Sequence, residues 1–193
     1  RTQTPEGAKP GVYLDPSTYV RETIGLFELI RDKTGFDAEL IHDVHERVPP
    51  IYAIMLAKEL EPMQLYFLED LFSTEQSAWY RQLRAACSTP IAHGELCVNP
   101  LEWIPLIQEQ LIDYIRIHSS MIGGITPTVK LAHFSEMYGV RTAWHGPTDM
   151  TPIGFVAQMH IGISSANFGI QEWPDFGGNL SEVFSGMPEI RAG

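Results

Sequence analysis

Residues 40–47 read LIHDVHER, an apolar run that ends abruptly in Asp43 and His45. Two further apolar runs close on an acid in the same way, LYFLE at residues 65–69 and IAHGE at residues 91–95. An apolar segment of this length that ends in a polar residue is typical of a buried strand leading into a functional loop. The three segments therefore predict three equivalent strands with an acid at the carboxyl end of each.

The three closing acids, Asp43, Glu69 and Glu95, stand at intervals of 26 and 26 residues. This fixed interval selects Glu69 over its neighbour Asp70, which we expect to support the site or to start the next helix. Carboxylate oxygens are preferred by hard divalent cations such as Mg²⁺, whereas zinc favours His and Cys. The spacing therefore predicts one metal site built from three repeating units.

Helix starts recur between these segments. Asp15 is a candidate N-cap with proline at the first helical position, and the apolar face that follows runs to Gly35. Further starts are indicated at Pro50, at Ser73 with Gln76, and at Asn99, Thr126 and Thr151, each of the last three followed by proline. Strands are expected between the helices, at residues 38–41, 65–68, 90–93, 114–117, 140–144 and 166–170.

Strand and helix alternate six times, with a polar residue at each strand end about every 25 residues. This pattern predicts an α/β fold with a parallel sheet and favours a (β/α) barrel, whose active site gathers at the carboxyl ends of its strands. A doubly wound open sheet is the alternative, but it normally has its site at one switch point. A complete barrel needs eight units and about 250 residues, so we expect an incomplete barrel.

The predicted organisation has three parts. Residues 1–14 are rich in proline and glycine and are expected to be a loop arriving from the upstream part of the barrel. Residues 15–175 form the barrel segment that carries the metal site. Residues 176–193 lack a clear period and are expected to be an exit segment.

Composition limits the classes of function. The chain has 193 residues, 44% of them hydrophobic, and a net charge of -11 with 13 scattered Lys and Arg residues. Nucleic-acid surfaces need clustered cations, so nucleic acid is not an expected partner. No apolar run approaches the roughly 18 residues of a membrane span, and no signal-peptide pattern is present. Cys87 and Cys97 follow no CxxC pattern and are expected to be buried reduced thiols. We expect a soluble cytoplasmic protein.

Two histidines are candidates for proton transfer. His45 follows Asp43 by two residues, so in extended geometry it would face the same side as the acid and act as a general acid beside the metal. His145 ends its strand directly before a Gly-Pro turn, which predicts a ring exposed at the barrel mouth. The other histidines, His42, His93, His133 and His160, are expected to be structural or surface residues.

Three further strand-end residues are candidates for substrate contacts. Arg116 and His118 share a face of one strand, and the guanidinium could hold a carboxylate or hydroxyl. Arg116 lies deeper and is the stronger candidate, whereas His118 stays open. Glu172 closes the last strand. Gly123 and Gly124 precede a helix start, which fits either an anion site or a tight turn.

With these residues in place, the sequence resembles the enolase superfamily, and within it the mannonate dehydratase subgroup with its starvation-sensing-protein-like members. The resemblance covers residues 15–173 and is carried by HDVHER, LEDLF, GELCVNP, LIDYIRIHSSMIGGITP, VRTAWHGPTDMTPIG and NFGIQEW. It implies a (β/α)7β barrel of the enolase type, preceded by an α+β capping domain and two strands that lie upstream of Arg1. We also expect a homo-oligomer.

The resemblance implies a role for each strand-end residue. Asp43, Glu69 and Glu95 would hold Mg²⁺ at the ends of the third, fourth and fifth barrel strands, and His45 would be the acid. Arg116, His145 and Glu172 would contact the sugar acid. The implied reaction is dehydration of an aldonic acid, D-mannonate or D-gluconate, to a 2-keto-3-deoxy acid through an enediolate. The family's base is a Tyr assisted by an Arg on an earlier loop, which we expect outside this chain.

Departures from the family pattern leave alternatives open. The sequence has LEDLF where the family often has LEDP, and Pro147 follows His145 by two residues at a position that varies among subgroup members. The choice between mannonate and gluconate therefore stays open. A second hypothesis is a binding or regulatory protein that keeps the metal site and turns over little. A metal-dependent hydrolase is less favoured, because such sites usually include His ligands.

Overall fold

The computed structural model describes residues 15–174 and 180–186, which form two compact units. The first unit contains the described residues 15–93 together with Leu111–Asp113. The second contains Gly94–Gln110 and the described residues from Tyr114 on. Each unit is built of parallel strands and the helices that follow them.

Helix α1 (Pro16–Thr34) shows how local sequence fixes the elements. The Asp15 carboxylate accepts a 2.7 Å hydrogen bond from the Thr18 backbone N–H, and Pro16 occupies the first helical position. The helix ends at Gly35, whose φ of 64° lies in the left-handed region that favours glycine. Both predicted boundaries of this helix are confirmed.

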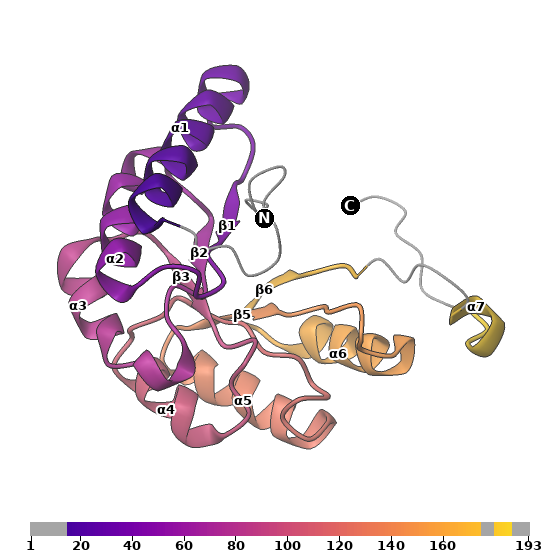
Figure 1. The fold of residues 1–193 in the computed structure, drawn as a ribbon. Helices are drawn as coiled ribbons and strands as arrows, with labels where there is room; N and C mark the ends of the chain where they lie inside the picture. The colour runs from indigo at the N-terminus through magenta and orange to yellow at the C-terminus, as the bar shows by residue number, and fades with distance from the viewer. Residues whose placement is uncertain (1–14, 175–179, 187–193) are drawn as a thin grey trace. The chain divides into compact units, whose positions relative to one another are not determined.

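In the first unit, three strands pair in chain order and in parallel. Asp43 lies opposite Glu69 in the ladder between the first two strands, and Glu69 lies opposite Ala92 in the next. The helices α1, α2 and α3 pack side by side along these strands (Figure 1). After α1 the elements are β1 (Ile41–Asp43), α2 (Pro50–Glu59), η1 (Glu61–Met63), β2 (Phe67–Glu69), η2 (Thr74–Gln76), α3 (Trp79–Ala86) and β3 (Ile91–His93).

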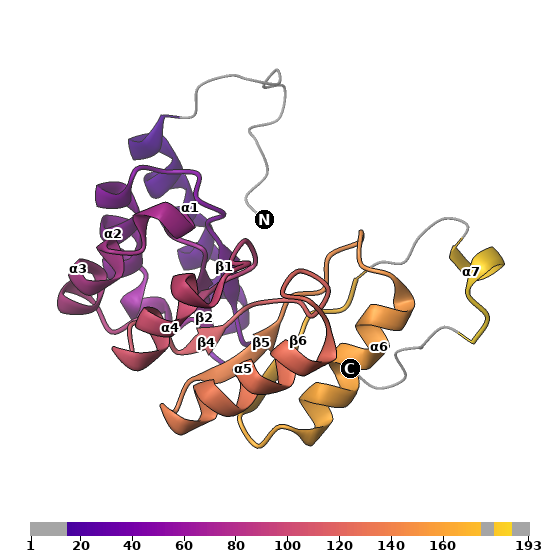
Figure 2. The same ribbon diagram turned by 90° about the horizontal axis from the view of Figure 1, so that it is seen from below.

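The second unit repeats the same arrangement. Its strands also pair in parallel and in chain order, and α5 and α6 pack on each other and along β5 and β6 (Figure 2). The elements are α4 (Pro100–Gln108), β4 (Tyr114–Ile115), α5 (Ile125–Met137), β5 (Arg141–Trp144), α6 (Pro152–Ser164), β6 (Phe168–Gln171) and α7 (Leu180–Val183). The predicted alternation of parallel strands and helices is thus confirmed in both units.

Some local predictions were wrong. Ser73 makes no capping hydrogen bond, and the residues after it form the short 3-10 helix η2, so α3 begins only at Trp79. The helix expected to start at Thr126 begins one residue earlier, because Gly124 is its N-cap. The first strand begins at Ile41 and ends at Asp43, three and two residues later than expected. Strand limits depend on the neighbouring strand, which local sequence does not specify.

The core and the cysteines agree with the composition. Apolar side chains of β2, α3 and β5, among them Phe67, Leu83 and Trp144, are fully or almost fully buried. Cys87 and Cys97 are buried free thiols, as expected. No helix within the described residues is both long and apolar enough to cross a membrane. The expected incoming loop, residues 1–14, lies outside the described residues, as does the expected exit segment apart from residues 180–186.

Candidate active site

Two of the three predicted metal ligands lie next to each other in the first unit. Asp43 and Glu69 are the last residues of β1 and β2 and stand opposite each other in the parallel ladder. Residues opposite each other in a ladder project to the same face of the sheet. The Glu69 side chain is buried, and Asp43 is mostly so, at 16% exposed. The pairing of these strands therefore places two carboxylates on one face at one edge.

His45 lies close to Asp43, but not for the predicted reason. The strand ends at Asp43, and His45 and Glu46 have φ angles of 52° and 57°, so the backbone is left-handed where an extended one was expected. The N–H groups of Val44 and Glu46 donate to the carbonyls of Glu69 and Asp70 and fix this turn. The turn leaves His45 Nδ1 at 3.7 Å from the Asp43 carboxylate. Such strained conformations persist only where the surroundings over-determine them.

A buried acid–base pair stands beside Glu69. The Asp70 carboxylate lies 2.7 Å from His93 Nδ1, and both side chains are 1% exposed. The Tyr80 ring packs at 5.0 Å from the His93 ring. Asp70 is thus engaged with the end of β3, as expected for a residue that supports the site, and His93 is a buried structural histidine, as expected.

His42, the histidine within β1, lies on the opposite face of the strand from Asp43. His42 is buried, and its Nε2 lies 3.0 Å from the hydroxyl of Tyr19 in α1. Burial lowers the pKa of His42 to about 4. A ring that stays neutral and faces a helix fits the structural role expected for His42. His133 and His160 are exposed on α5 and α6.

In the second unit, Arg116 connects three strand ends. It follows β4 directly, is 6% exposed, and points Nη1 at the carbonyls of Ala143 and Trp144 at the end of β5. Its Nη2 donates a 2.5 Å hydrogen bond to Glu172, just after β6. The structure therefore brings together Arg116 and Glu172, which are 56 residues apart in the sequence.

His145 lies between two carboxylates of the same unit. Its Nε2 is 3.4 Å from Glu95 and 3.9 Å from Glu172. Its side chain is 14% exposed, so the ring is mostly buried and less open than the sequence predicted. Four of the predicted site residues, Glu95, Arg116, His145 and Glu172, thus form one connected cluster, which we call the Arg116–Glu172 cluster.

Two glycines permit the close approach of these strand ends. Gly94 has a φ of 135°, and a side chain on it would meet Ile117 at 3.0 Å, so only glycine fits directly before Glu95. A side chain on Gly146 would lie 2.4 Å from the Glu172 carbonyl oxygen. Gly146 instead donates its N–H to the Glu172 carboxylate at 2.9 Å. The glycine after His145 is therefore required by the close packing of the two strand ends.

Charge in the cluster is set by these contacts. Burial alone would raise the pKa of Glu172, but the Arg116 guanidinium, the Gly146 N–H and His145 outweigh it and lower that pKa below its ordinary value. Glu172 is therefore an anion at neutral pH. Its side chain is 42% exposed, so part of its carboxylate remains accessible. The cluster offers a buried cation, exposed carboxylate oxygens and an imidazole to a polar ligand.

Sequence reasoning missed some of the residues that shape this cluster. Gln158 of α6 is completely buried, accepts from the Ser119 N–H and donates to the His145 carbonyl, both at 2.8 Å. His118, left open by the sequence, has its Nδ1 3.0 Å from His145 Nδ1. A polar glutamine in the middle of a largely apolar helix was the one available signal for the first. The sequence did place His118 on the same strand face as Arg116, but nothing in it pointed to the contact with His145.

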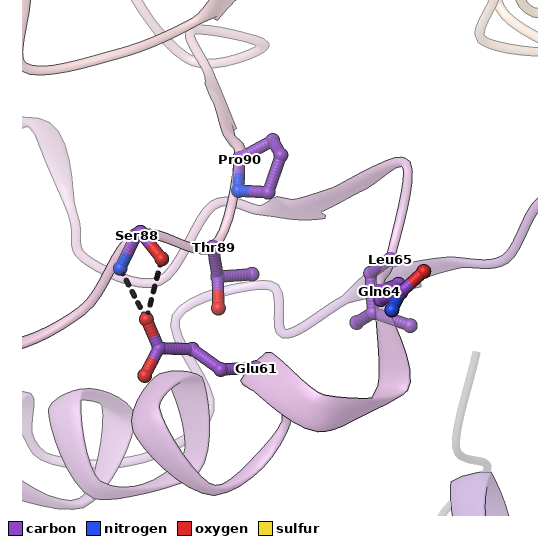
Figure 3. Close-up of a pocket in the computed structure, with 6 residues that line it drawn as sticks. All are labelled: Glu61, Gln64, Leu65, Ser88, Thr89 and Pro90. Carbon is purple, nitrogen blue, oxygen red and sulfur yellow. Dashed lines mark hydrogen bonds between the residues drawn. The ribbon is translucent and has the colours of Figure 1, made fainter.

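A pocket in the first unit lies at the other end of its strands. Its volume is about 280 Å³, and it opens beside the residues that precede β2 and β3 (Figure 3). The Glu61 carboxylate accepts hydrogen bonds from the backbone N–H and hydroxyl of Ser88 at 2.5 and 2.7 Å. The lining residues are Glu61, Gln64, Leu65, Ser88, Thr89 and Pro90. This pocket belongs to the amino-terminal edge of the strands, away from the carboxylates that end them.

Comparison with known proteins identifies the family. Residues 8–193 match the family model described as enolase C-terminal domain-like, and the chain belongs to this family. The predicted resemblance to the enolase superfamily is thereby confirmed. The narrower mannonate dehydratase subgroup stays a prediction.

Individual relatives are similar over nearly the whole chain. A D-galactonate dehydratase family member of Musicola paradisiaca is 56% identical over 191 residues, which are 99% of this chain and 46% of that protein. A D-galactonate dehydratase family member of Pantoea ananatis is 54% identical over 191 residues, 99% of this chain and 46% of the relative. The chain thus spans about half the length of these relatives.

A solved structure supports the fold. The crystal structure of an enolase from Pantoea ananatis with bound D-gluconate and Mg superposes with a TM-score of 0.90 at 55% identity, covering 96% of this chain and 45% of that one. The predicted fold class, an incomplete (β/α) barrel of the enolase type, is confirmed by this likeness.

Proposed function

We propose that this chain carries the metal-binding and sugar-acid-binding residues of a magnesium-dependent hydro-lyase that dehydrates an aldonic acid. The observation that carries the proposal is the Arg116–Glu172 cluster, a buried cation joined to two carboxylates and an imidazole at strand ends. Its support is the 55% identical Pantoea ananatis enolase, which binds D-gluconate and Mg. Because the chain spans about half of its relatives, the activity is proposed for the protein at its full natural length.

Asp43, Glu69 and Glu95 are the proposed ligands of Mg²⁺. The donor set fits this ion, because all three side chains offer carboxylate oxygens, and Glu69 and Glu95 are 3% and 6% exposed. Buried carboxylates are unfavourable unless they are paired or coordinate a cation. When bound, Mg²⁺ would supply a positive charge that polarises the substrate carboxylate.

The Arg116–Glu172 cluster is the proposed contact for the sugar acid. A polyhydroxy acid needs donors for its oxygens and acceptors for its hydroxyl hydrogens. Arg116 and His145 provide the donors, and the exposed oxygens of Glu172 provide acceptors. Because Arg116 is already fixed by Glu172 and by two backbone carbonyls, it would bind without further ordering.

His45 is the proposed general acid. It would protonate the hydroxyl that leaves from the carbon next to the one that has lost its proton, so that water departs and the enol rearranges to a 2-keto-3-deoxy acid. Its side chain is 38% exposed, which leaves it accessible to a ligand, and its backbone is fixed by the turn after β1.

The test incubates the full-length protein with Mg²⁺ and D-gluconate, D-mannonate or D-galactonate and measures the 2-keto-3-deoxy product. We expect product from at least one acid and none after chelation of the metal. Absence of product from every acid, with Mg²⁺ shown to be bound, would overturn the dehydratase proposal. It would instead favour a protein that binds the metal and a sugar acid without significant turnover.

A pair of matched variants tests the metal ligands. Glu69→Gln removes a buried carboxylate charge at the end of β2, whereas Glu59→Gln makes the same change at an exposed position at the end of α2. We expect weaker Mg²⁺ binding, measured by calorimetry, for the first variant only. Equal affinities for both variants would remove Glu69 from the ligand set.

The cytoplasmic location and the homo-oligomer stay predictions.

A further inference from the structure

We propose that His118 is a positioning residue that holds the imidazole of His145 with its Nε2 directed toward Glu95 and Glu172. The inference rests on the proposed function, because it assigns His145 to the substrate side of the site. The residue it adds is His118, which the sequence left open and which contacts His145 at Nδ1 rather than on the carboxylate side.

The first observation is the contact between the two rings. Their Nδ1 atoms lie 3.0 Å apart, and the ring planes are tilted by 47° with centroids 5.1 Å apart. This geometry is a hydrogen bond between ring nitrogens, in which one ring donates and the other accepts. Because Nδ1 and Nε2 hold fixed positions in one rigid ring, fixing Nδ1 of His145 also aims its Nε2, which faces the carboxylates at 3.4 and 3.9 Å.

The second observation is that the two backbones carrying these rings are tied together. Gln158, with no exposed surface, accepts from the N–H of Ser119, which follows His118, and donates to the carbonyl of His145 itself. His145 also donates its own N–H to the Ile117 carbonyl at 3.2 Å. The loop after β4 and the end of β5 are thus held in register on both sides of the ring pair.

The ring pair also restricts where His145 carries its hydrogen. If His145 donates from Nε2 to a carboxylate and is neutral, its Nδ1 must accept, so His118 must donate. If both nitrogens of His145 carry hydrogen, His118 must accept. Burial lowers the pKa of His118, with Asp149 partly opposing it, and this favours a neutral His118 that can take either role.

The nitrogen of His118, rather than its bulk, is therefore the feature to test. His118→Phe keeps a ring but removes the nitrogen, whereas His118→Asn keeps a polar atom near the position of Nδ1. His133→Phe, at an exposed position on α5, is the matched control. His118→Ala serves as the second variant if the Phe variant does not fold.

The experiment records long-range ¹H–¹⁵N spectra of the histidine rings in the full-length protein, with His145 assigned by its loss in His145→Gln. We expect His118→Phe and His118→Ala to shift the His145 ring nitrogens, and His118→Asn and His133→Phe to leave them near wild type. In the dehydration assay, we expect kcat to fall about tenfold or more with little change in KM or melting temperature, because small misplacements of a catalytic group are costly. His118→Asn should recover most of this loss.

Unshifted His145 ring nitrogens in both His118→Phe and His118→Ala would overturn the inference. Wild-type kcat in those variants, in an active wild-type enzyme, would overturn it as well. A wild-type protein that dehydrates no sugar acid would contradict the proposed function instead. In that case the spectra alone still decide whether His118 positions the ring.

Discussion

Acid is expected to weaken the fold through His42 in β1. Its ring is 3% exposed, lies 3.0 Å from the Tyr19 hydroxyl, and meets the edge of the Phe27 ring at a centroid distance of 5.4 Å. Burial lowers the pKa of His42 from 6.5 to about 4. The folded protein therefore resists protonation of this ring, while the unfolded chain accepts it.

The size of the effect follows from the two pKa values. Between about pH 6.5 and 4 the unfolded chain binds one proton more at this residue, so stability falls as the pH falls through that window. Above pH 6.5 the contribution is fully present. Across this window the free energy of unfolding falls by about 3 kcal/mol, because each unit of pKa difference corresponds to about 1.4 kcal/mol. At pH 4.5 most of this, about 2.5 kcal/mol, should already be lost.

Urea unfolding of the wild type and of His42→Gln at pH 7 and pH 4.5 measures this contribution. We expect the advantage of the wild type over the variant to be smaller at pH 4.5 by about 2.5 kcal/mol, because the variant has no group to protonate here. His160→Gln, at an exposed ring on α6, is the control and should follow the wild type at both pH values. Parallel loss of stability in the wild type and His42→Gln would refute the reasoning.

Three further predictions concern the first unit. Arg31→Leu removes the hydrogen bonds that Arg31 donates to four backbone carbonyls, those of Met63, Gly35, Ala38 and Gln64. Urea unfolding should show a loss of about 3 kcal/mol in the free energy of unfolding. For Arg21→Leu, at an exposed position in the same helix, we expect a loss of at most about 0.5 kcal/mol. Asp70→Ala and His93→Ala should each lower the free energy of unfolding by about 3–5 kcal/mol, because each breaks the contact between two buried ionisable side chains. A double-mutant cycle should show strong coupling between the two positions, and additive losses would argue against the pair. Burial raises the pKa of Cys87, so iodoacetamide should label it only after unfolding, and rapid labelling of the folded protein would contradict its burial.

Local sequence predicted helix starts well because a cap involves only neighbouring residues. Asp15, Asn99 and Thr151 all accept the hydrogen bonds expected of N-caps, and each is followed by proline. Ser73, with Gln76 three residues later, was also predicted to cap a helix, yet its side chain makes no capping hydrogen bond and the residues after it form the 3-10 helix η2. A cap signal therefore marks a possible start, and the surrounding packing decides whether it is used.

The turn at His45 shows where local reasoning failed. The sequence placed His45 beside Asp43 by assuming an extended chain, yet the backbone there is left-handed. The carbonyls that fix it belong to Glu69 and Asp70, in the next strand. The proximity of His45 to the acid was foreseen, but its cause depends on a strand about 25 residues away.

The sequence alone determined which residue types end the strands of this protein, because a period of 26 residues and the apolar runs before each acid are local and repetitive features. Tertiary structure decided which of these residues meet. The contacts of Arg116 with Glu172, of His145 with Glu95 and His118, and of the buried Gln158 join positions 13 to 56 residues apart. Such partners are selected by the parallel pairing of strands and the packing of helices on them, and no short window of sequence contains both members of these pairs.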